Sequence, residues 1–323
     1  MLRSSLIKNI VGLFALINLT NLLAQPYPTK PIRLSVGYAP GGSTDVVARI
    51  FGQRLADAIG QPVVIENRPG AGGAIAADLV AKAEPDGHRI LMLGTGTLNY
   101  SVLTKNVPYN MLKDFTPITY VAASPQVLVV SNSIPSRSVG ELIQLARSKP
   151  GELTYGSEGI GGIAHLAAAQ FSLMTGTQLS HVPFKGAIES TVAIAGGQID
   201  MNIPNLTSAL PLLKADKFRA LAVTGLKRSS LLPSIPTLDE SGLKGYEVLA
   251  WFGFVGPAGM PKSVVERLNM EFIKIANLPE VKEALAKQAM DVQIRPPEEF
   301  AAFLRETAMS TVRLANDVKL KME

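Results

Sequence analysis

Short apolar runs alternate with amphipathic helical patterns along most of this chain, and this alternation restricts the possible folds more than any other feature. The first unit is an apolar strand at 32–38, a glycine-rich loop and a helix whose apolar residues fall on one face. A second set of such units runs from about 127 to 223. Strands that alternate with helices form parallel sheets covered by helices, so the sequence predicts an α/β fold.

The chain is long enough for two packed domains. It has 323 residues, 47% of them hydrophobic and 18% charged, and is too apolar to be disordered. Two long amphipathic helices, 261–276 and 298–318, follow an irregular connection with too little strand for a third domain. We therefore expect lobe 1 to contain residues 25–126 and 247–323, and lobe 2 to contain residues 127–246, with the ligand between the lobes.

The amino-terminal residues have the pattern of a secretory signal peptide. Arg3 and Lys8 precede an apolar run that ends near a small residue, Ala24. This run is shorter than the roughly 20 residues that a membrane-spanning helix needs. We expect cleavage of residues 1–24 and a mature protein in the periplasm. Because the sequence has no cysteine, disulfides, a thiol nucleophile and a thioether lipid anchor are excluded.

Charge and histidine content favour neither nucleic acid nor metal as a partner. The formal net charge of +5 includes Arg3 and Lys8, and the remaining charges are interspersed rather than clustered as they are in nucleic-acid-binding proteins. The three histidines, His88, His165 and His181, have no spacing typical of a zinc site. We expect no metal and no cofactor.

A loop rich in glycine and hydroxyl residues joins the first strand to the first helix. It reads Tyr38-Ala39-Pro40-Gly41-Gly42-Ser43-Thr44-Asp45. Glycines before a helix let backbone N–H groups approach an anion, and the helix dipole adds positive potential. The alternative is an ordinary turn in which Ser43 caps the helix and Asp45 stabilises its first turn. The loop lacks the Gly-Lys-Ser/Thr ending of a nucleotide P-loop, so a small carboxylate fits it better than a nucleotide.

A second glycine-rich loop, in the other predicted lobe, repeats this chemistry. It contains Ser157, Gly161 and Gly162 and leads into a helix with His165 in its first turn. Closure of the two lobes brings both loops to one ligand. The alternative is that both loops are structural turns, because glycine is common in α/β loops.

Four further residues are weaker candidates. Thr95 and Thr97 follow the third predicted strand at its carboxyl end, where they either line the cleft or belong to a polar loop. Lys185 lies just beyond another strand end and is either a cation for a second carboxylate or a surface lysine. Trp251, the single tryptophan, is expected in the core near the hinge, with a place in the cleft wall as the alternative.

An enzymatic alternative has little support in the sequence. There is no Gly-x-Ser-x-Gly nucleophile elbow, and no pair of carboxylates stands out from the charged helix faces. Ser157 and His165 lie close together at one helix start, and this pair is the basis of a hydrolase hypothesis.

Taken together, the motifs resemble those of the Bug (Bordetella uptake gene) receptors, the periplasmic binding components of tripartite tricarboxylate transporters. The resemblance covers essentially the whole mature chain and rests on several segments that occur in the same order at similar spacing. These segments are 38–49, 66–73, 156–166, 183–186, 221–224, 236–237 and 256–259.

The resemblance implies a two-lobed periplasmic binding protein of the Venus-flytrap type, with two Rossmann-like domains joined by crossover hinge segments and no catalysis. It also implies a ligand carboxylate held by main-chain groups, hydroxyls and ordered water at loop 41–45. The implied ligands are di- and tricarboxylates, acidic amino acids and aromatic acids. The implied partner is a membrane permease, with a sensor protein as the alternative, and we expect the receptor to be monomeric.

Overall fold

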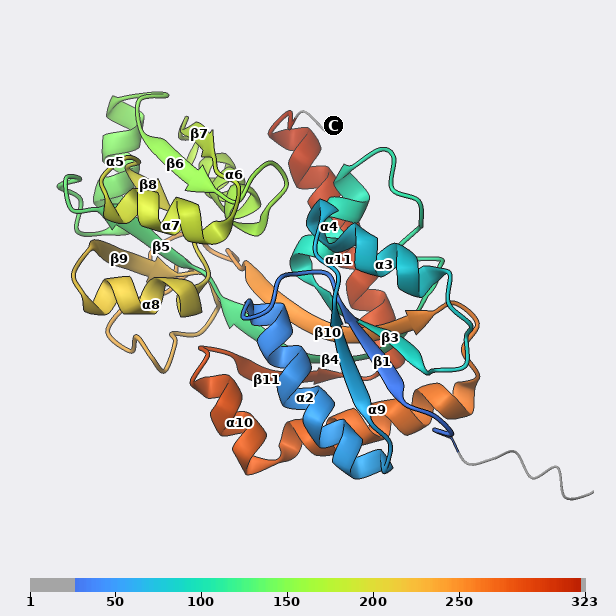
Figure 1. The fold of residues 1–323 in the computed structure, drawn as a ribbon. Coiled ribbons are helices and arrows are strands. Elements are labelled where there is room, and N and C mark those ends of the chain that lie inside the picture. Colours follow the sequence, from blue (N-terminus) through green and yellow to red (C-terminus); the bar gives the residue numbers. More distant parts are fainter. Residues whose placement is uncertain (1–26, 321–323) are drawn as a thin grey trace, which may run out of the picture.

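The computed structural model describes residues 27–320, which form two α/β lobes (Figure 1). Each lobe is built on one β-sheet, with helices packed on both faces. The predicted signal peptide, residues 1–24, lies outside the described residues. Within residues 27–320, every helix is too short or too polar to span a lipid bilayer.

A six-stranded sheet forms the centre of the first lobe. Its strands are β1 (Ile32–Val36), β2 (Val63–Asn67), β3 (Arg89–Gly94), β4 (Phe115–Pro125), β10 (Leu249–Pro257) and β11 (Asp291–Arg295). Their order across the sheet is β11-β4-β10-β3-β1-β2. The parallel pairing expected from the sequence holds for β1, β2 and β3. The other three strands pair antiparallel, because β10 enters the sheet as the chain returns from the second lobe.

Both faces of this sheet are apolar, as a sheet covered on two sides requires. Successive residues of β3 point to opposite cores: Ile90 packs on one face and Leu91 on the other. Helices α2 (Ser43–Ile59), α9 (Lys262–Asn277) and α10 (Pro279–Ala286) cover the first face. The other face is covered by α3 (Ala74–Ala81), α4 (Thr95–Leu103) and α11 (Pro297–Asp317).

A five-stranded sheet forms the centre of the second lobe. Its strands are β5 (Val127–Ser131), β6 (Thr154–Ser157), β7 (Ser180–Pro183), β8 (Met201–Asn202) and β9 (Phe218–Val223), in the order β7-β6-β8-β5-β9. β6 is parallel to β7 and β8, whereas β5 is antiparallel to β8 and β9. The covering helices are α5 (Val139–Ser148) and α6 (Ile163–Thr175) on one face, and α7 (Ala187–Ala195) and α8 (Leu206–Lys214) on the other.

The chain crosses between the two sheets twice. Gln126 alone separates β4 from β5, and the return segment joins β9 to β10. The crossings are tied together: the Gln126 N–H donates to Thr224 Oγ1 at 2.8 Å, and the Thr224 N–H donates to the Gln126 carbonyl at 3.0 Å. The lobe boundaries drawn from the sequence, 126/127 and 246/247, stay a prediction.

Candidate ligand site

A cavity of about 710 Å³ lies between the lobes, at the carboxyl ends of β1, β3, β6 and β7. Its volume is in the range of about 300–1,000 Å³ that is usual for small-molecule sites. Residues from both lobes and the crossing residue Gln126 line it. Parallel strands direct their carboxyl ends and the following helix starts to this edge, so the fold itself concentrates loops and helix N-termini around the cavity.

Four helices begin at the wall of this cavity, two from each lobe. Their N-cap residues are Gly42 for α2, Gly94 for α4, Gly162 for α6 and Gly186 for α7. A glycine N-cap has no side chain that could accept hydrogen bonds from the first helical turn. In α2, neither the Ser43 nor the Thr44 N–H has an acceptor within residues 27–320. The α2 N-terminus therefore presents unpaired donors and positive potential to the cavity.

The N-terminus of α6 differs because a carboxylate already contacts it. Glu158 Oε1 accepts the Ala164 N–H at 3.2 Å, and Glu158 lines the cavity. Burial raises the pKa of the Glu158 carboxyl above its ordinary value, although backbone N–H groups, including those of Ala164 and Ile163, act in the opposite direction. The α6 N-terminus is thus partly satisfied by the chain itself.

Asp45 supports the glycine loop of the first lobe from beneath. Its side chain is 2% exposed and does not line the cavity. Asp45 Oδ2 accepts the Gly41 N–H and Arg49 Nε–H, each at 2.9 Å, and Oδ1 accepts from Asn67 Nδ2 at 2.8 Å. Burial alone raises the pKa of the Asp45 carboxyl, but the hydrogen bonds from Arg49, Gly41 and Asn67 bring it below its ordinary value. Asp45 is therefore a charged support for the loop.

In the second lobe, histidines lie beneath the glycine-rich loop, as Asp45 does in the first lobe. His165 Nδ1 accepts the Gly161 N–H at 3.1 Å, and its ring stacks on His181 with 4.0 Å between centroids. Burial, together with the neighbouring His181, lowers the pKa of His165 to about 4. Ser157 Oγ forms its 2.6 Å hydrogen bond with Nε2 of His181, whereas His165 Nδ1 accepts from Gly161. The Ser157–His165 pair of the hydrolase hypothesis is wrong, because the two side chains have different partners.

The sequence analysis did not single out Gln126, which the structure places in the cavity wall. The residue is fully buried, and both its amide nitrogen and its amide oxygen lack a hydrogen-bond partner among the described residues. A buried amide without partners is costly, so a ligand that supplies both an acceptor and a donor fits it. The one available signal in the sequence is a polar residue between two apolar strands.

Of the residues predicted from the sequence, one group lines the cavity and another does not. The lining residues are Tyr38, Gly42, Ser43, Thr44, Thr95, Gly161, Gly162 and Lys185. The residues outside the lining are Gly41, Asp45, Thr97, Ser157 and His165. Trp251 is both a core residue, 2% exposed, and part of the cavity wall.

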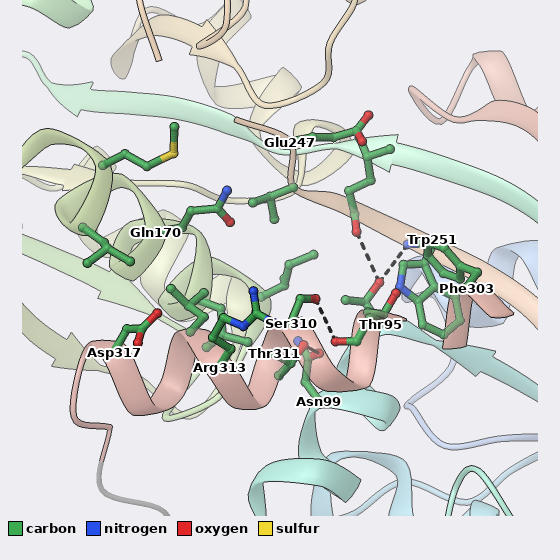
Figure 2. A pocket seen from close by; sticks show the side chains of 18 of the residues that line it. Thr95, Asn99, Gln170, Glu247, Trp251, Phe303, Ser310, Thr311, Arg313 and Asp317 are labelled. Atoms are coloured by element: carbon green, nitrogen blue, oxygen red, sulfur yellow. Dashed lines mark hydrogen bonds between the residues drawn. The ribbon is translucent and has the colours of Figure 1, made fainter. Parts of the chain in front are cut away.

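A second cavity, of about 510 Å³, shares Thr95, Ile163 and Trp251 with the first (Figure 2). Its walls come mainly from α6 of one lobe and α11 of the other, so its width changes when the lobes move. Figure 2 shows Gln170 on one side and the α11 side chains on the other. Its lining includes Glu247 and Asp317 as well as arginines, and this mixed charge gives no clear preference for an anion.

A metal site is not evident in the part of the chain that the structure describes, which has no cluster of three or more His, Asp or Glu side chains able to hold an ion. The cavity wall within the same residues carries one lysine, Lys185, one carboxylate, Glu158, and no arginine. Recognition of an anion there depends on backbone N–H groups, hydroxyls and amides.

Comparison with known proteins gives a consistent set of matches. The model of the family described as "Tripartite tricarboxylate transporter family receptor" matches residues 47–320. Protein BugT of Bordetella pertussis is 32% identical over 303 residues, which cover 93% of this chain and 93% of BugT.

Two solved structures with bound ligands are also similar. Rpa4515 of R. palustris with adipate has a TM-score of 0.82 and 33% identity, and the match covers 91% of this chain and 99% of that one. MatC from Rhodopseudomonas palustris with bound malate has a TM-score of 0.77 and 29% identity, with coverage of 89% and 99%.

Proposed function

This chain belongs to the tripartite tricarboxylate transporter receptor family, and from that premise we propose that it binds a small carboxylate in the cavity between its lobes and delivers it to a membrane permease. Members of this family are solute-binding proteins rather than enzymes. Capture takes place in the periplasm, and closure of the lobes around the ligand follows when the ligand binds the closed state more tightly.

The observation that carries this proposal is the open N-terminus of α2. Ser43 and Thr44 line a cavity whose wall, among the described residues, contains no arginine, and the N–H groups of both residues have no acceptor there. A carboxylate accepts hydrogen bonds from such donors and is stabilised by the helix dipole. The loop is held in position by the Gly41–Asp45 hydrogen bond, so little reorganisation is needed on binding.

Gln126 extends the proposed site to the crossing between the lobes. Its amide N–H groups donate to a ligand oxygen, and its amide oxygen accepts from a ligand hydroxyl or a bridging water. Because Gln126 lies where β4 passes into β5, a ligand that bonds to it contacts the segment about which the lobes move. Ligand capture and lobe closure are thereby linked at one residue.

The test is binding of a carboxylate panel to the mature protein by thermal unfolding and calorimetry, with Gln126→Leu as the variant. A bound carboxylate raises the melting temperature of the unmodified protein. In Gln126→Leu we expect the affinity to fall about tenfold or more, the effect of losing a buried hydrogen bond to a charged group. The unfolding free energy of the ligand-free variant does not fall, because the amide has no partner to lose.

Gln53→Leu is the matched control, since Gln53 is exposed on the same lobe and lies away from the cavity. This variant retains the affinity of the unmodified protein. A panel in which no mono-, di- or tricarboxylate binds contradicts the proposed function. Equal affinities in Gln126→Leu and Gln53→Leu remove Gln126 from the site.

A further inference from the structure

We propose that Glu158 determines specificity by occupying the position of a second ligand carboxylate, so that the cavity selects an amino carboxylate over a dicarboxylate. The ligand's carboxylate lies at the N-terminus of α2, and its ammonium group lies against Glu158. This inference rests on the proposed function and names the class of ligand within it.

The position of Glu158 is the first support. A ligand with two carboxylates needs an anion-binding end in each lobe, and the α6 N-terminus is one of the two helix starts that the second lobe brings to the cavity. Glu158 Oε1 already accepts the Ala164 N–H at 3.2 Å there. A second ligand carboxylate at α6 has to displace Glu158 or lie beside a like charge, and both cost affinity.

The local backbone accommodates this arrangement. A Cβ atom at Gly162, the N-cap of α6, would lie 2.6 Å from both Oε1 and Cδ of Glu158. Glycine at this position lets the carboxyl group pack directly over the start of the helix. A side chain at position 162 would require the Glu158 carboxyl group to move away from the start of α6.

The Glu158 carboxyl, whose pKa is raised by burial, lacks a cationic partner within the described residues. It takes part in none of the ion pairs there, and the cavity's one lysine, Lys185, is exposed and does not pair with it. Burial raises the pKa of the phenol of Tyr38, from the loop of the other lobe; the Thr97 hydroxyl lowers it, and the Glu158 carboxylate adds to the rise. A ligand ammonium supplies the missing positive charge and gains a carboxylate partner in a partly desolvated place.

The rest of the cavity suits such a ligand. Its wall includes apolar and aromatic side chains, among them Leu103, Ile160 and Phe252, beside polar ones such as Gln126. These side chains pack against a short aliphatic or aromatic body. The wall thus combines helix N–H donors for the ligand's carboxylate at α2, apolar side chains for its body and the Glu158 side chain for its ammonium group.

The experiment compares three matched ligand series by calorimetry: unbranched ω-amino acids, monocarboxylates and dicarboxylates of equal length, for example 6-aminohexanoate, hexanoate and adipate. We expect the unmodified protein to bind the amino acid at least tenfold more tightly than the dicarboxylate of the same length. Glu158→Gln keeps the size of the side chain and an oxygen for the Ala164 N–H but removes the charge. In this variant the amino acid loses about tenfold and the dicarboxylate gains.

Glu152→Gln is the matched control, because Glu152 is an exposed glutamate of the same lobe outside the cavity. It leaves the ranking of the three ligands unchanged. The inference is overturned if the unmodified protein binds the dicarboxylate as tightly as the amino acid, or if Glu158→Gln keeps the original ranking. Absence of binding for every carboxylate in both proteins overturns the proposed function itself, which distinguishes the two failures.

Discussion

Two of the four glycine-capped helix starts at the cavity, those of α2 and α6, are alike in sequence pattern and different in structure. At α2 the first-turn N–H groups are open to the cavity, and the loop is held from beneath by the buried carboxylate of Asp45. At α6 a carboxylate, Glu158, contacts the first turn, and the loop is held by the neutral His165. The start of α2 therefore offers unpaired N–H donors to the cavity, whereas the start of α6 is covered by a carboxyl group of the chain.

This difference shows that a glycine-rich loop before a helix is not sufficient to identify an anion site. Whether the helix end is available depends on what the rest of the loop places over it. In the first lobe the acidic residue follows the glycines and turns back beneath them. In the second lobe the acidic residue precedes them and reaches over the first turn, so the same composition has the opposite consequence.

The largest effect is expected when Asp45, which supports the glycine-rich loop of the first lobe, is removed. Asp45→Ala removes the acceptor of the Gly41 N–H, Arg49 and Asn67, and a buried, charged hydrogen-bond network of this kind stabilises a protein by about 3 kcal/mol. We expect the unfolding free energy measured in urea to fall by that amount. Asp57→Ala, an exposed change on the same helix, shifts it by less than about 0.5 kcal/mol. Similar values for the two variants contradict a supporting role for Asp45.

A somewhat smaller effect is expected when the N-terminus of α2 is given a carboxylate of its own, as the N-terminus of α6 has in Glu158. Gly42→Asp places a carboxylate at the N-cap of α2, where it accepts hydrogen bonds from the first turn. We expect carboxylate affinity to fall at least about 100-fold, because the ligand's position is taken by an anion that is part of the chain. The melting temperature of the ligand-free protein stays the same or rises slightly.

Gly42→Ala is the control for this change. A Cβ atom at Gly42 would lie 3.6 Å from the Ala39 carbonyl oxygen, an ordinary contact, so alanine fits without strain. Calorimetry then shows an affinity within a few-fold of the unmodified protein. If Gly42→Asp also retains its affinity, the open end of α2 is not where the ligand carboxylate lies.

The fold could be predicted where the signal is local. The alternation of strands and helices predicted the α/β class, and the glycine-rich loops predicted the edge of the cavity. These loops can be recognised from the sequence because the turns require a positive φ at Gly41 and Gly161, a conformation that glycine adopts readily. The segment at Thr95 was open to interpretation as a polar loop and is the start of α4. Its Thr-Gly-Thr sequence has weak helix propensity, and packing of Leu98 against the sheet decides its structure.

The site could be predicted only in part, because its remaining features depend on contacts between distant segments. Gln126 is in the wall since the chain crosses between the sheets there, and no local pattern shows that its amide has no partner. Glu158 was visible in the second loop, but its contact with Ala164 depends on how the loop folds over α6. Ser157 met His181 rather than His165 because β6 pairs with β7, a register that spacing along the chain does not reveal.

The smallest expected effect is a pH dependence of the unfolding free energy, which distinguishes the two loop supports, Asp45 and His165. Because the pKa of His165 is about 4 in the folded protein and ordinarily 6.5, the unfolded chain binds a proton more readily between these values. Stability from this group is complete above about pH 6.5, declines as the pH falls toward 4, and levels off below it. The pKa of Asp45 is lowered, so the support in the first lobe keeps its charge throughout this window.

We expect urea unfolding at several pH values to show that the unfolding free energy declines by about 1–2 kcal/mol between pH 6.5 and 4 as the unfolded chain takes up the proton. His165→Asn keeps an acceptor for the Gly161 N–H and removes the titrating ring, so its stability declines less over the same window. Asp45→Ala is less stable than the unmodified protein but declines as steeply. If the unfolding free energy of His165→Asn declines as steeply as that of the unmodified protein, a neutral His165 does not support the second loop.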